Sequence, residues 1–202
     1  MVEPLFCNLN KRATFYRYVS KLFNVCTYFI VEEDKLIIID PGKLDDKVFE
    51  WLNKYKSINK TVYISHEHFD HHYHANRIFE LEKTCFFSPS ENFNDALKDT
   101  RKNLSYYYDD PTETKPNLIT SDAYLEIIKT PGHSVESYCF IYDNVLFGGD
   151  SIIEKKYLVF KLPGGNKNDF MKSVDNLTKT IDSNTIVLPG HGDLFWFNEW
   201  TI

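Results

Sequence analysis

Five of the seven histidines in this chain lie between His66 and His74, in the segment SHEHFDHHYHANRIFE from Ser65 to Glu80. Closely spaced imidazoles gain little from burial and repel one another once protonated, so packing alone does not explain them. The segment is internal, which excludes a terminal affinity tag. Neutral imidazole is a common metal ligand, and Asp70 stands among these histidines. The segment therefore predicts a metal site.

Three later turns each place an imidazole or a carboxylate just after an apolar run, beside glycines that permit a sharp turn. They are TPGHSVES with His133, FGGDSI with Asp150 and LPGHGD with His191. One such residue alone is most often an ordinary turn residue. Together with the cluster, they complete a set of candidate nitrogen and oxygen ligands: His66, His68, Asp70, His71, His133, Asp150 and His191. Seven donors exceed the needs of one tetrahedral ion, whereas two ions that share a carboxylate would use them all.

The spacing within the cluster also fits metal binding. Alternate residues of an extended segment face the same side, so His66 and His68 can bind one ion, with Asp70 nearby. His71 would face away unless the chain turns there. The start of a helix would provide that turn and would let Asp70 and His71 bind a neighbouring ion.

Strands and helices alternate along the chain. Apolar and β-branched runs predict strands at 25–31, 35–40, 61–65, 124–130, 137–142, 144–149 and 185–190. Helical spacing predicts helices over 43–55 and 168–181, and a third that begins near Ser88, where Ser88 and Glu91 have capping-box spacing. The candidate ligands follow predicted strands, where functional residues of α/β proteins usually lie. The polar segment 89–116 predicts a loop or helical insertion that covers a site.

The two halves of the chain resemble each other. KLIIIDPG, which contains Asp40, is similar to NVLFGGDS, and TVYISHEH is similar to TIVLPGHG. Each half therefore has one strand that ends in an acidic turn and one that ends in a histidine turn. If the strand ends of both halves converge, all these turns come to one edge.

Composition narrows the class of protein. With 202 residues and 43% hydrophobic content, the chain predicts a single domain over residues 1–202. A net charge of −6 argues against a protein whose main task is to grip a nucleic-acid backbone, so no long nucleic acid is expected as a partner. One run of lysines is interpreted as a solvated loop: Lys155, Lys156, Lys161 and Lys167.

The opening segment, the apolar runs and the cysteines indicate the cellular compartment. The opening segment has no apolar run of signal-peptide length, and no segment approaches the roughly 18 apolar residues of a membrane span. We therefore expect a cytoplasmic protein without a membrane partner. The cysteines form no CxxC pair, and Cys26 and Cys139 lie in apolar runs, which favours buried free thiols over ligands or disulfides.

At this point the sequence resembles a known family. HEHFDH matches the HxHxDH motif of the metallo-β-lactamase superfamily, and the later His133, Asp150 and His191 follow in the order of that family. The resemblance runs from about Val25 to Asp193. It implies an α/β fold, an αββα sandwich of two mixed β-sheets flanked by helices, with the metals at one edge between the sheets.

The resemblance also implies a role for each residue. The first metal would be held by His66, His68 and His133, and the second by Asp70, His71 and His191. Asp150 would bridge the two ions, and Asp40 would support the ligand loop. His72 and His74 match no ligand position, and we expect them to support the ligands or to face solvent.

Departures from the family pattern narrow the expected function. His74 and Glu136 stand where many members have glycine. The sequence ends eleven residues after His191, so we expect no C-terminal helical domain of the kind that binds glutathione in glyoxalase II. Asp150 argues against a true β-lactamase, which usually has Cys or Ser there, and His68 argues against flavodiiron oxidoreductases, which usually have Glu.

The resulting prediction is a dinuclear metal-dependent hydrolase that cleaves a small ester, thioester or lactone with a metal-bridging hydroxide. Asp70 would orient the water and relay a proton, which makes it the expected catalytic residue. Two divalent ions are expected, zinc in the first place, with iron or manganese open because the ligand set barely distinguishes them.

Three other functions stay open. The first is a phosphodiesterase that acts on a small or cyclic nucleotide with help from the lysine run. The second is an iron-loaded oxidoreductase similar to a sulfur dioxygenase. The third, a catalytically idle binding protein, is disfavoured by the complete ligand set.

Overall fold

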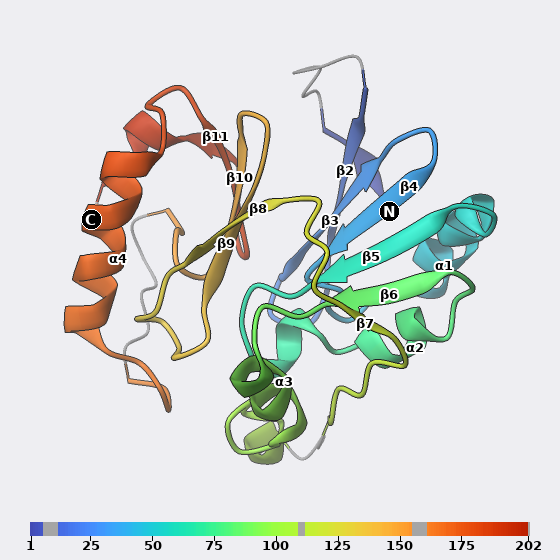
Figure 1. Ribbon diagram of the computed structural model, residues 1–202, viewed down its shortest axis with the longest axis horizontal. Coiled ribbons are helices and arrows are strands. Elements are labelled where there is room, and N and C mark those ends of the chain that lie inside the picture. The colour runs from blue at the N-terminus through green and yellow to red at the C-terminus, as the bar shows by residue number, and fades with distance from the viewer. Residues whose placement is uncertain (6–11, 109–111, 155–160, 202) are drawn as a thin grey trace. The chain divides into compact units, whose positions relative to one another are not determined.

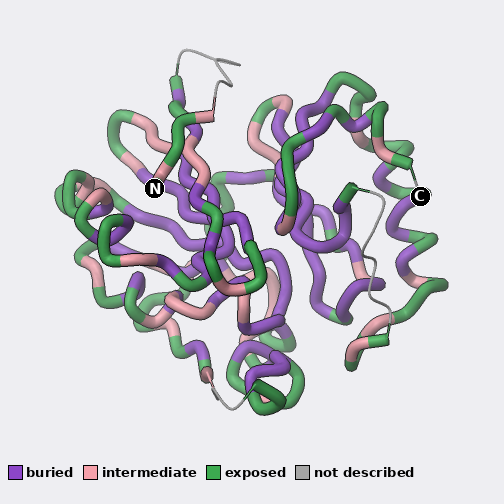
Figure 2. The backbone as a smooth tube through the Cα atoms, turned by 180° about the vertical axis from the view of Figure 1, so that it is seen from behind, coloured by how far each residue is buried: buried purple, intermediate pink, exposed green. Residues whose placement is uncertain are grey.

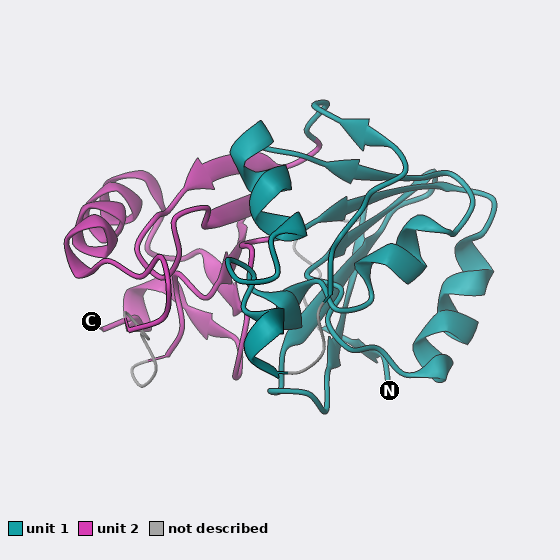
Figure 3. Ribbon diagram, turned by 90° about the horizontal axis from the view of Figure 1, so that it is seen from below, with its two compact units in different colours: residues 1–64, 68–123 teal, residues 65–67, 124–202 magenta. Residues whose placement is uncertain are grey.

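The computed structural model describes residues 1–5, 12–108, 112–154 and 161–201 (Figure 1). The chain divides into two compact units (Figure 3). Unit 1 contains Met1–Ile64 and His68–Ala123, and unit 2 contains Ser65–Glu67 and Tyr124–Ile202. The short segment Ser65–Glu67, at the start of the histidine cluster, thus belongs with the second half of the chain. The expectation of one domain over residues 1–202 stays a prediction.

Unit 1 is built on a mixed sheet in the order β1-β2-β3-β4-β5-β6-β7. Its strands are β1 Glu3–Pro4, β2 Thr14–Val19, β3 Cys26–Val31, β4 Lys35–Ile39, β5 Asn59–Tyr63, β6 Thr84–Phe87 and β7 Ile119–Thr120. Strands β1 to β4 pair antiparallel, and β4 to β7 pair parallel. Strands β3 and β4 are buried along nearly their whole length (Figure 2), as their continuous apolar sequences require.

The α-helices of unit 1 each bury apolar residues, and short 3-10 turns accompany them. They are α1 Asp46–Leu52, η1 Asn53–Tyr55, η2 Phe69–His71, α2 Ala75–Phe79, α3 Glu91–Lys98 and η3 Ser105–Tyr108. Trp51 of α1 packs on Phe29 of β3, with ring centroids 5.0 Å apart. Phe79 of α2 and Phe93 of α3 both contact Phe86 of β6. These contacts fix the helices on the sheet, whose strand β5 leads into the histidine segment.

Unit 2 holds a mixed sheet in the order β12-β11-β10-β9-β8. Its elements are β8 Glu126–Lys129, β9 Tyr138–Tyr142, β10 Val145–Gly149, α4 Lys167–Thr180, β11 Ile186–Pro189, β12 Phe195–Trp196 and η4 Phe197–Glu199. Strands β10 and β11 pair parallel, and the other pairs are antiparallel. Leu177 of α4 belongs to the same buried cluster as Leu146 of β10 and Val187 of β11. The helix therefore packs its apolar stripe on this sheet.

The structure confirms most predicted elements. All seven predicted strands are present within two residues of their predicted ends, and both long helices form. The short strands β1, β7 and β12, together with β2 and β6, were not predicted. The internal resemblance corresponds to two parallel strand pairs, β4 with β5 and β10 with β11. Two mixed β-sheets with flanking helices confirm the expected fold class.

The third helix is present near the predicted place, as α3 Glu91–Lys98, but its predicted cap was wrong. The residue that caps α3 is Ser90, whose side chain accepts a hydrogen bond of 3.1 Å from the Phe93 amide. Ser88 instead donates its hydroxyl to the Ser90 carbonyl and the Asn94 side chain. The segment 89–116 does include helical turns, in α3 and η3.

Other expectations concern isolated residues. Cys26 and Cys139 are buried free thiols, as predicted, whereas Cys7 lies outside the described residues. Lys155 and Lys156 of the predicted lysine loop also lie outside them, and Lys161 is exposed. Within the described ranges, no helix has the length and apolar character needed to cross a membrane.

Candidate metal centre

The histidine segment follows β5 and changes from an extended to a helical conformation before His71, where the predicted metal site requires a turn. His68 is extended, with φ −67° and ψ 133°, and the next residues form the helical turn η2, Phe69–His71. The predicted turn at His71 is therefore present. His66, His68 and His71 are each at most 4% exposed. Buried imidazoles at this density need partners that offset the loss of water.

In unit 1, His71 lies between two carboxylates. Its Nδ1 is 3.0 Å from Asp40 Oδ2, and its Nε2 is 3.7 Å from Asp70 Oδ2. The first contact is a hydrogen bond, which leaves Nε2 as the atom directed to a metal. Asp40 thus supports a ligand of the loop, as expected. The second contact is longer than a good hydrogen bond.

Asp40 is held by the strands around it. Its carbonyl accepts a hydrogen bond from Thr27 Oγ1 at 2.7 Å, and its amide donates to the Tyr63 carbonyl at 3.0 Å. Its φ of +51° places it in the left-handed region, where Asp is tolerated better than most residues. This conformation turns the side chain from the end of β4 toward His71, 31 residues later in the chain.

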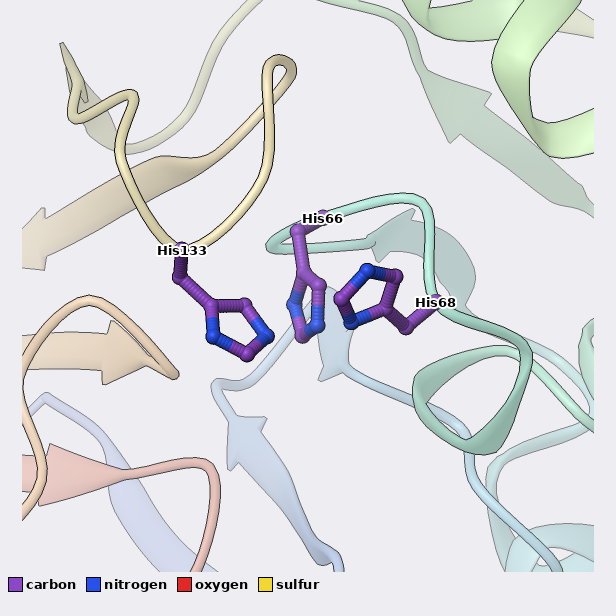
Figure 4. Close-up of side chains that lie close together, drawn as sticks. All are labelled: His66, His68 and His133. Carbon is purple, nitrogen blue, oxygen red and sulfur yellow. The ribbon is translucent and has the colours of Figure 1, made fainter. Parts of the chain in front are cut away.

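In unit 2, a second group surrounds Asp150. Asp150 Oδ2 lies 3.6 Å from His133 Nε2 and 3.5 Å from His191 Nε2. A ring nitrogen of His66 lies within 4.8 Å of one of His133, and one lies within 4.8 Å of an Asp150 carboxylate oxygen. The rings of His66 and His133 meet edge to face, with centroids 4.9 Å apart (Figure 4). Ser65 Oγ contacts His66 Nδ1 at 3.0 Å, which leaves Nε2 directed to a metal.

These separations fit metal ligands. Donors bound to one tetrahedral zinc at its usual bond lengths lie about 3.3 Å apart. The three imidazole–carboxylate distances of 3.5 to 3.7 Å are close to that value and long for hydrogen bonds. Imidazole and carboxylate are also the donors that Zn, Fe and Mn accept. Histidines and aspartates of the described chain thus form groups that could hold a metal ion.

The turn that carries His133 is fixed at both ends. Thr130 and Ser137 close it through a backbone hydrogen bond of 2.8 Å. On its outer side, the Asn166 amide donates to the Gly132 carbonyl at 2.8 Å, and Ser173 Oγ of α4 donates to the Pro131 carbonyl at 2.7 Å. His133 therefore projects from a turn that the helix α4 holds against the sheet.

Asp150 and His191 follow the parallel strands β10 and β11. The Gly190 amide donates to the Gly149 carbonyl at 2.7 Å, so the two strand ends remain paired up to the ligands. The acidic turn and the histidine turn of this half therefore lie side by side, as the internal resemblance predicted. In unit 1, the corresponding turns follow β4 and β5.

His72 and His74 are supports rather than solvent-facing residues. His72 is fully buried, and its Nδ1 contacts Thr114 Oγ1 at 2.6 Å. His74 Nδ1 accepts a hydrogen bond of 2.9 Å from the Leu44 amide, and its ring packs against Phe49. Burial lowers the pKa of His74, which keeps it the neutral acceptor that this bond requires. Its φ of −102° suits any residue, so histidine replaces the usual glycine without strain.

Two buried glutamates, Glu67 and Glu136, were not predicted to have a role. Ser134 Oγ donates to Glu67 Oε2 at 2.6 Å, and burial raises the pKa of the Glu67 carboxyl. Glu136 accepts hydrogen bonds from Lys129 Nζ at 3.1 and 3.2 Å and from the Tyr138 hydroxyl at 2.7 Å. Glutamate side chains are rarely buried without a partner. The position of Glu67 between two candidate histidine ligands was therefore the signal in the sequence for a supporting role.

Comparisons with known proteins agree with this chemistry. The family model of the metallo-beta-lactamase superfamily matches residues 21–191. The chain is 25% identical over 180 residues to the probable metallo-hydrolase YqgX of Bacillus subtilis (strain 168), covering 82% of this chain and 83% of that protein. The same bacterium has the probable polyketide biosynthesis zinc-dependent hydrolase PksB, 23% identical over 180 residues, 83% of this chain and 72% of the relative. A hydroxyacylglutathione hydrolase of Idiomarina loihiensis is 24% identical over 170 residues, 84% of this chain and 58% of the enzyme.

Solved structures share the fold. The B3 metallo-beta-lactamase BLEG-1 superposes with a TM-score of 0.79 at 22% identity, covering 92% of this chain and 95% of that chain. TTHA1623, solved in a di-iron-bound form, superposes with a TM-score of 0.73 at 20% identity, covering 90% and 94%. At these identities the likeness shows the fold alone. The family match spans most of the sequence, and the chain belongs to the metallo-β-lactamase superfamily.

Proposed function

We propose that this chain is a dinuclear metal-dependent hydrolase that acts on a small ester, thioester or lactone. Its family and the relatives named as metallo-hydrolases make it a metallo-hydrolase with a His-rich metal site. In the proposal, one ion is held by His66, His68 and His133, and the other by Asp70, His71 and His191. Asp150 would bridge them.

The position of Asp150 carries the dinuclear proposal. One oxygen of its carboxylate lies 3.6 Å from His133 Nε2 and 3.5 Å from His191 Nε2, close to the separation of two ligands on one ion. The proposal assigns these two histidines to different ions. A carboxylate between two cations offsets part of their mutual repulsion. A turn aspartate would instead accept hydrogen bonds from nearby backbone amides.

Divalent ions at such a centre act as Lewis acids, which polarise a carbonyl group and lower the pKa of water. The remaining tasks fall to the protein. Asp70 and His191 have the most exposed side chains of the candidate ligands, at 15% and 25%. In the proposal, substrate and water approach on their side, and the Asp70 carboxylate orients the attacking water and accepts its proton.

Three observations support the finer choice of substrate and metal. Hydroxyacylglutathione hydrolase, a thioester hydrolase by its name, is among the relatives. PksB is named as zinc-dependent. The Asp150 oxygen that lies 3.6 Å from His133 Nε2 and 3.5 Å from His191 Nε2 supports two ions that share a carboxylate. An iron-loaded oxidoreductase is the second candidate, because TTHA1623 has the same fold in a di-iron form.

A substrate panel on one metal-defined sample tests the proposal. Protein loaded separately with zinc and with iron is assayed on thioesters, lactones, simple esters and a small bis-phosphodiester, with His133→Ala as the ligand-deficient control. Hydrolysis of an acyl substrate that the control loses is the expected result. Cleavage of the phosphodiester alone, or oxygen consumption by the iron form alone, would overturn it.

A further inference from the structure

Glu67 occupies an unusual place, because it lies between two candidate ligands in sequence and contacts the turn of a third. Its residue is 4% exposed, and its Oε2 accepts a hydrogen bond of 2.6 Å from Ser134 Oγ. Ser134 directly follows His133 and is itself fully buried. A hydrogen bond between residues 67 positions apart thus connects the histidine segment to the His133 turn.

The donor of this bond is held in a defined orientation. Ser134 Oγ lies 2.8 Å from Ser137 Oγ, and the Ser134 amide donates to the same hydroxyl at 3.3 Å. Ser137 closes the turn through its backbone bond with Thr130. Because the Ser134 hydroxyl has one proton, its donation to Glu67 leaves it to accept from Ser137. The turn therefore presents a fixed donor to the Glu67 carboxylate.

His66 is held on both sides. Before it, the Ser65 carbonyl accepts a hydrogen bond of 2.7 Å from the Tyr138 amide. After it, Glu67 accepts the bond from Ser134. A side-chain substitution cannot remove the backbone bond between Tyr138 and Ser65. The bond between Ser134 and Glu67, by contrast, depends on two side chains. The backbone amide of Glu136 also donates to the Glu67 carboxylate, so Glu67 is bound to the segment that follows His133 by a side chain and by the backbone.

We propose that Glu67 is a positioning residue of the metal site, which acts through Ser134 to hold His66 and His133 at the separation that one ion requires. The inference rests on the proposed function in assigning these histidines to one ion. The bond fixes the backbone on which both imidazoles stand. Substitutions of such supporting residues in metal sites typically lower metal affinity by about 10- to 100-fold.

The test measures metal affinity without any substrate. Zinc affinity of wild type, Glu67→Met, Ser134→Ala and the double variant is determined by competition with a chromophoric chelator; methionine keeps the length of the side chain but has no oxygen to accept the Ser134 hydroxyl. The visible spectrum of the cobalt-loaded proteins reports ligand geometry. Each single variant is expected to lose about tenfold or more in affinity at the tighter site, with altered cobalt bands. The double variant should lose little beyond the larger single loss, because both changes break one bond.

Ser173→Ala is the matched control. It also removes one serine hydroxyl that binds the His133 turn, at the Pro131 carbonyl, but on the side away from the ligand segment. Its melting temperature should fall about as much as that of Ser134→Ala, with zinc affinity and cobalt spectrum unchanged. Unchanged affinity in Glu67→Met and Ser134→Ala, or an equal loss in Ser173→Ala, would overturn the inference. Failure of the wild type to bind zinc or cobalt would instead contradict the proposed function.

Discussion

In His66 and His71, one ring nitrogen contacts a neighbouring side chain and the other is left for a metal. His71 gives Nδ1 to Asp40 and has Nε2 beside Asp70, and His66 has Nδ1 beside Ser65. A hydrogen bond at one nitrogen fixes the ring and selects the tautomer that binds through the other. These contacts, rather than the histidines alone, give the site its geometry.

Asp40→Asn tests this division of labour. Asparagine tolerates the left-handed conformation of Asp40, so the backbone should persist while the charge behind His71 is lost. We expect the more weakly bound ion to lose about tenfold in affinity, with little change in the melting temperature of metal-free protein. A chelator titration measures it. Asp46→Asn, on the exposed surface of α1, is the control, and equal affinities in the two variants would contradict the role of Asp40.

The candidate ligands could be selected from the sequence because they follow apolar strands within recognisable turns. Their supports could not. Glu67 meets Ser134, and His72 meets Thr114, across separations of 67 and 42 residues. Such contacts depend on how distant loops fold together, and no local periodicity records them. Glu136 was noticed as a departure, yet its pairing with Lys129 follows only from their positions across the β8–β9 turn.

At the scale of elements, the central strands were predictable and the short edge strands were not. Strand β3 is a continuous apolar run, whereas β1, β7 and β12 have two residues each. Strands of that length exist because a neighbour offers hydrogen bonds, so their own sequence carries little signal. The helix α3 was predicted with the wrong cap, since Ser88 and Ser90 both precede it and only geometry distinguishes them.

Substitution of the two serines tests that correction. Ser90→Ala removes the acceptor for the Phe93 amide and should destabilise the protein by about 1 kcal/mol. Ser88→Ala removes hydrogen bonds that the hydroxyl donates to Ser90 and Asn94 but leaves the cap in place. Chemical denaturation of both variants measures the difference. A larger loss in Ser88→Ala would support the cap that the sequence suggested and contradict the structure.

The His133 turn offers a second test at this scale. Gly132 has φ +145°, and a Cβ there would lie 2.4 Å from the Phe170 Cα of α4. Gly132→Ala should therefore cost more than the roughly 1–3 kcal/mol of backbone strain alone, and the shifted turn should weaken metal binding. Gly192 also has a positive φ, +90°, but a Cβ there meets nothing within 4 Å. Gly192→Ala should show strain alone, and equal losses of stability would contradict the close packing against α4.

At the scale of the whole molecule, each unit carries part of the ligand set. Unit 1 holds His68, Asp70 and His71, and unit 2 holds His66, His133, Asp150 and His191. The chain passes from unit 1 to unit 2 and back within the histidine segment. A metal ion that binds the folded chain and not the unfolded chain stabilises the folded state by an amount that grows with free metal concentration.

Asp150→Asn tests the dinuclear account most directly. The substitution keeps the shape of the side chain but removes the charge that offsets two neighbouring dications. Asp143→Asn, a turn aspartate with φ +52° outside the ligand set, is the matched control. Metal content, melting temperature and turnover are measured on the same zinc-loaded samples.

The account predicts two ions per chain for wild type and for Asp143→Asn, and close to one for Asp150→Asn. Turnover of Asp150→Asn should fall by ~10² or more, on the order of 3 kcal/mol of barrier, while the metal-free protein melts near the wild-type temperature. A reproducible wild-type content of one ion or fewer would contradict the account. So would an Asp150→Asn variant that retains two ions and the full rate.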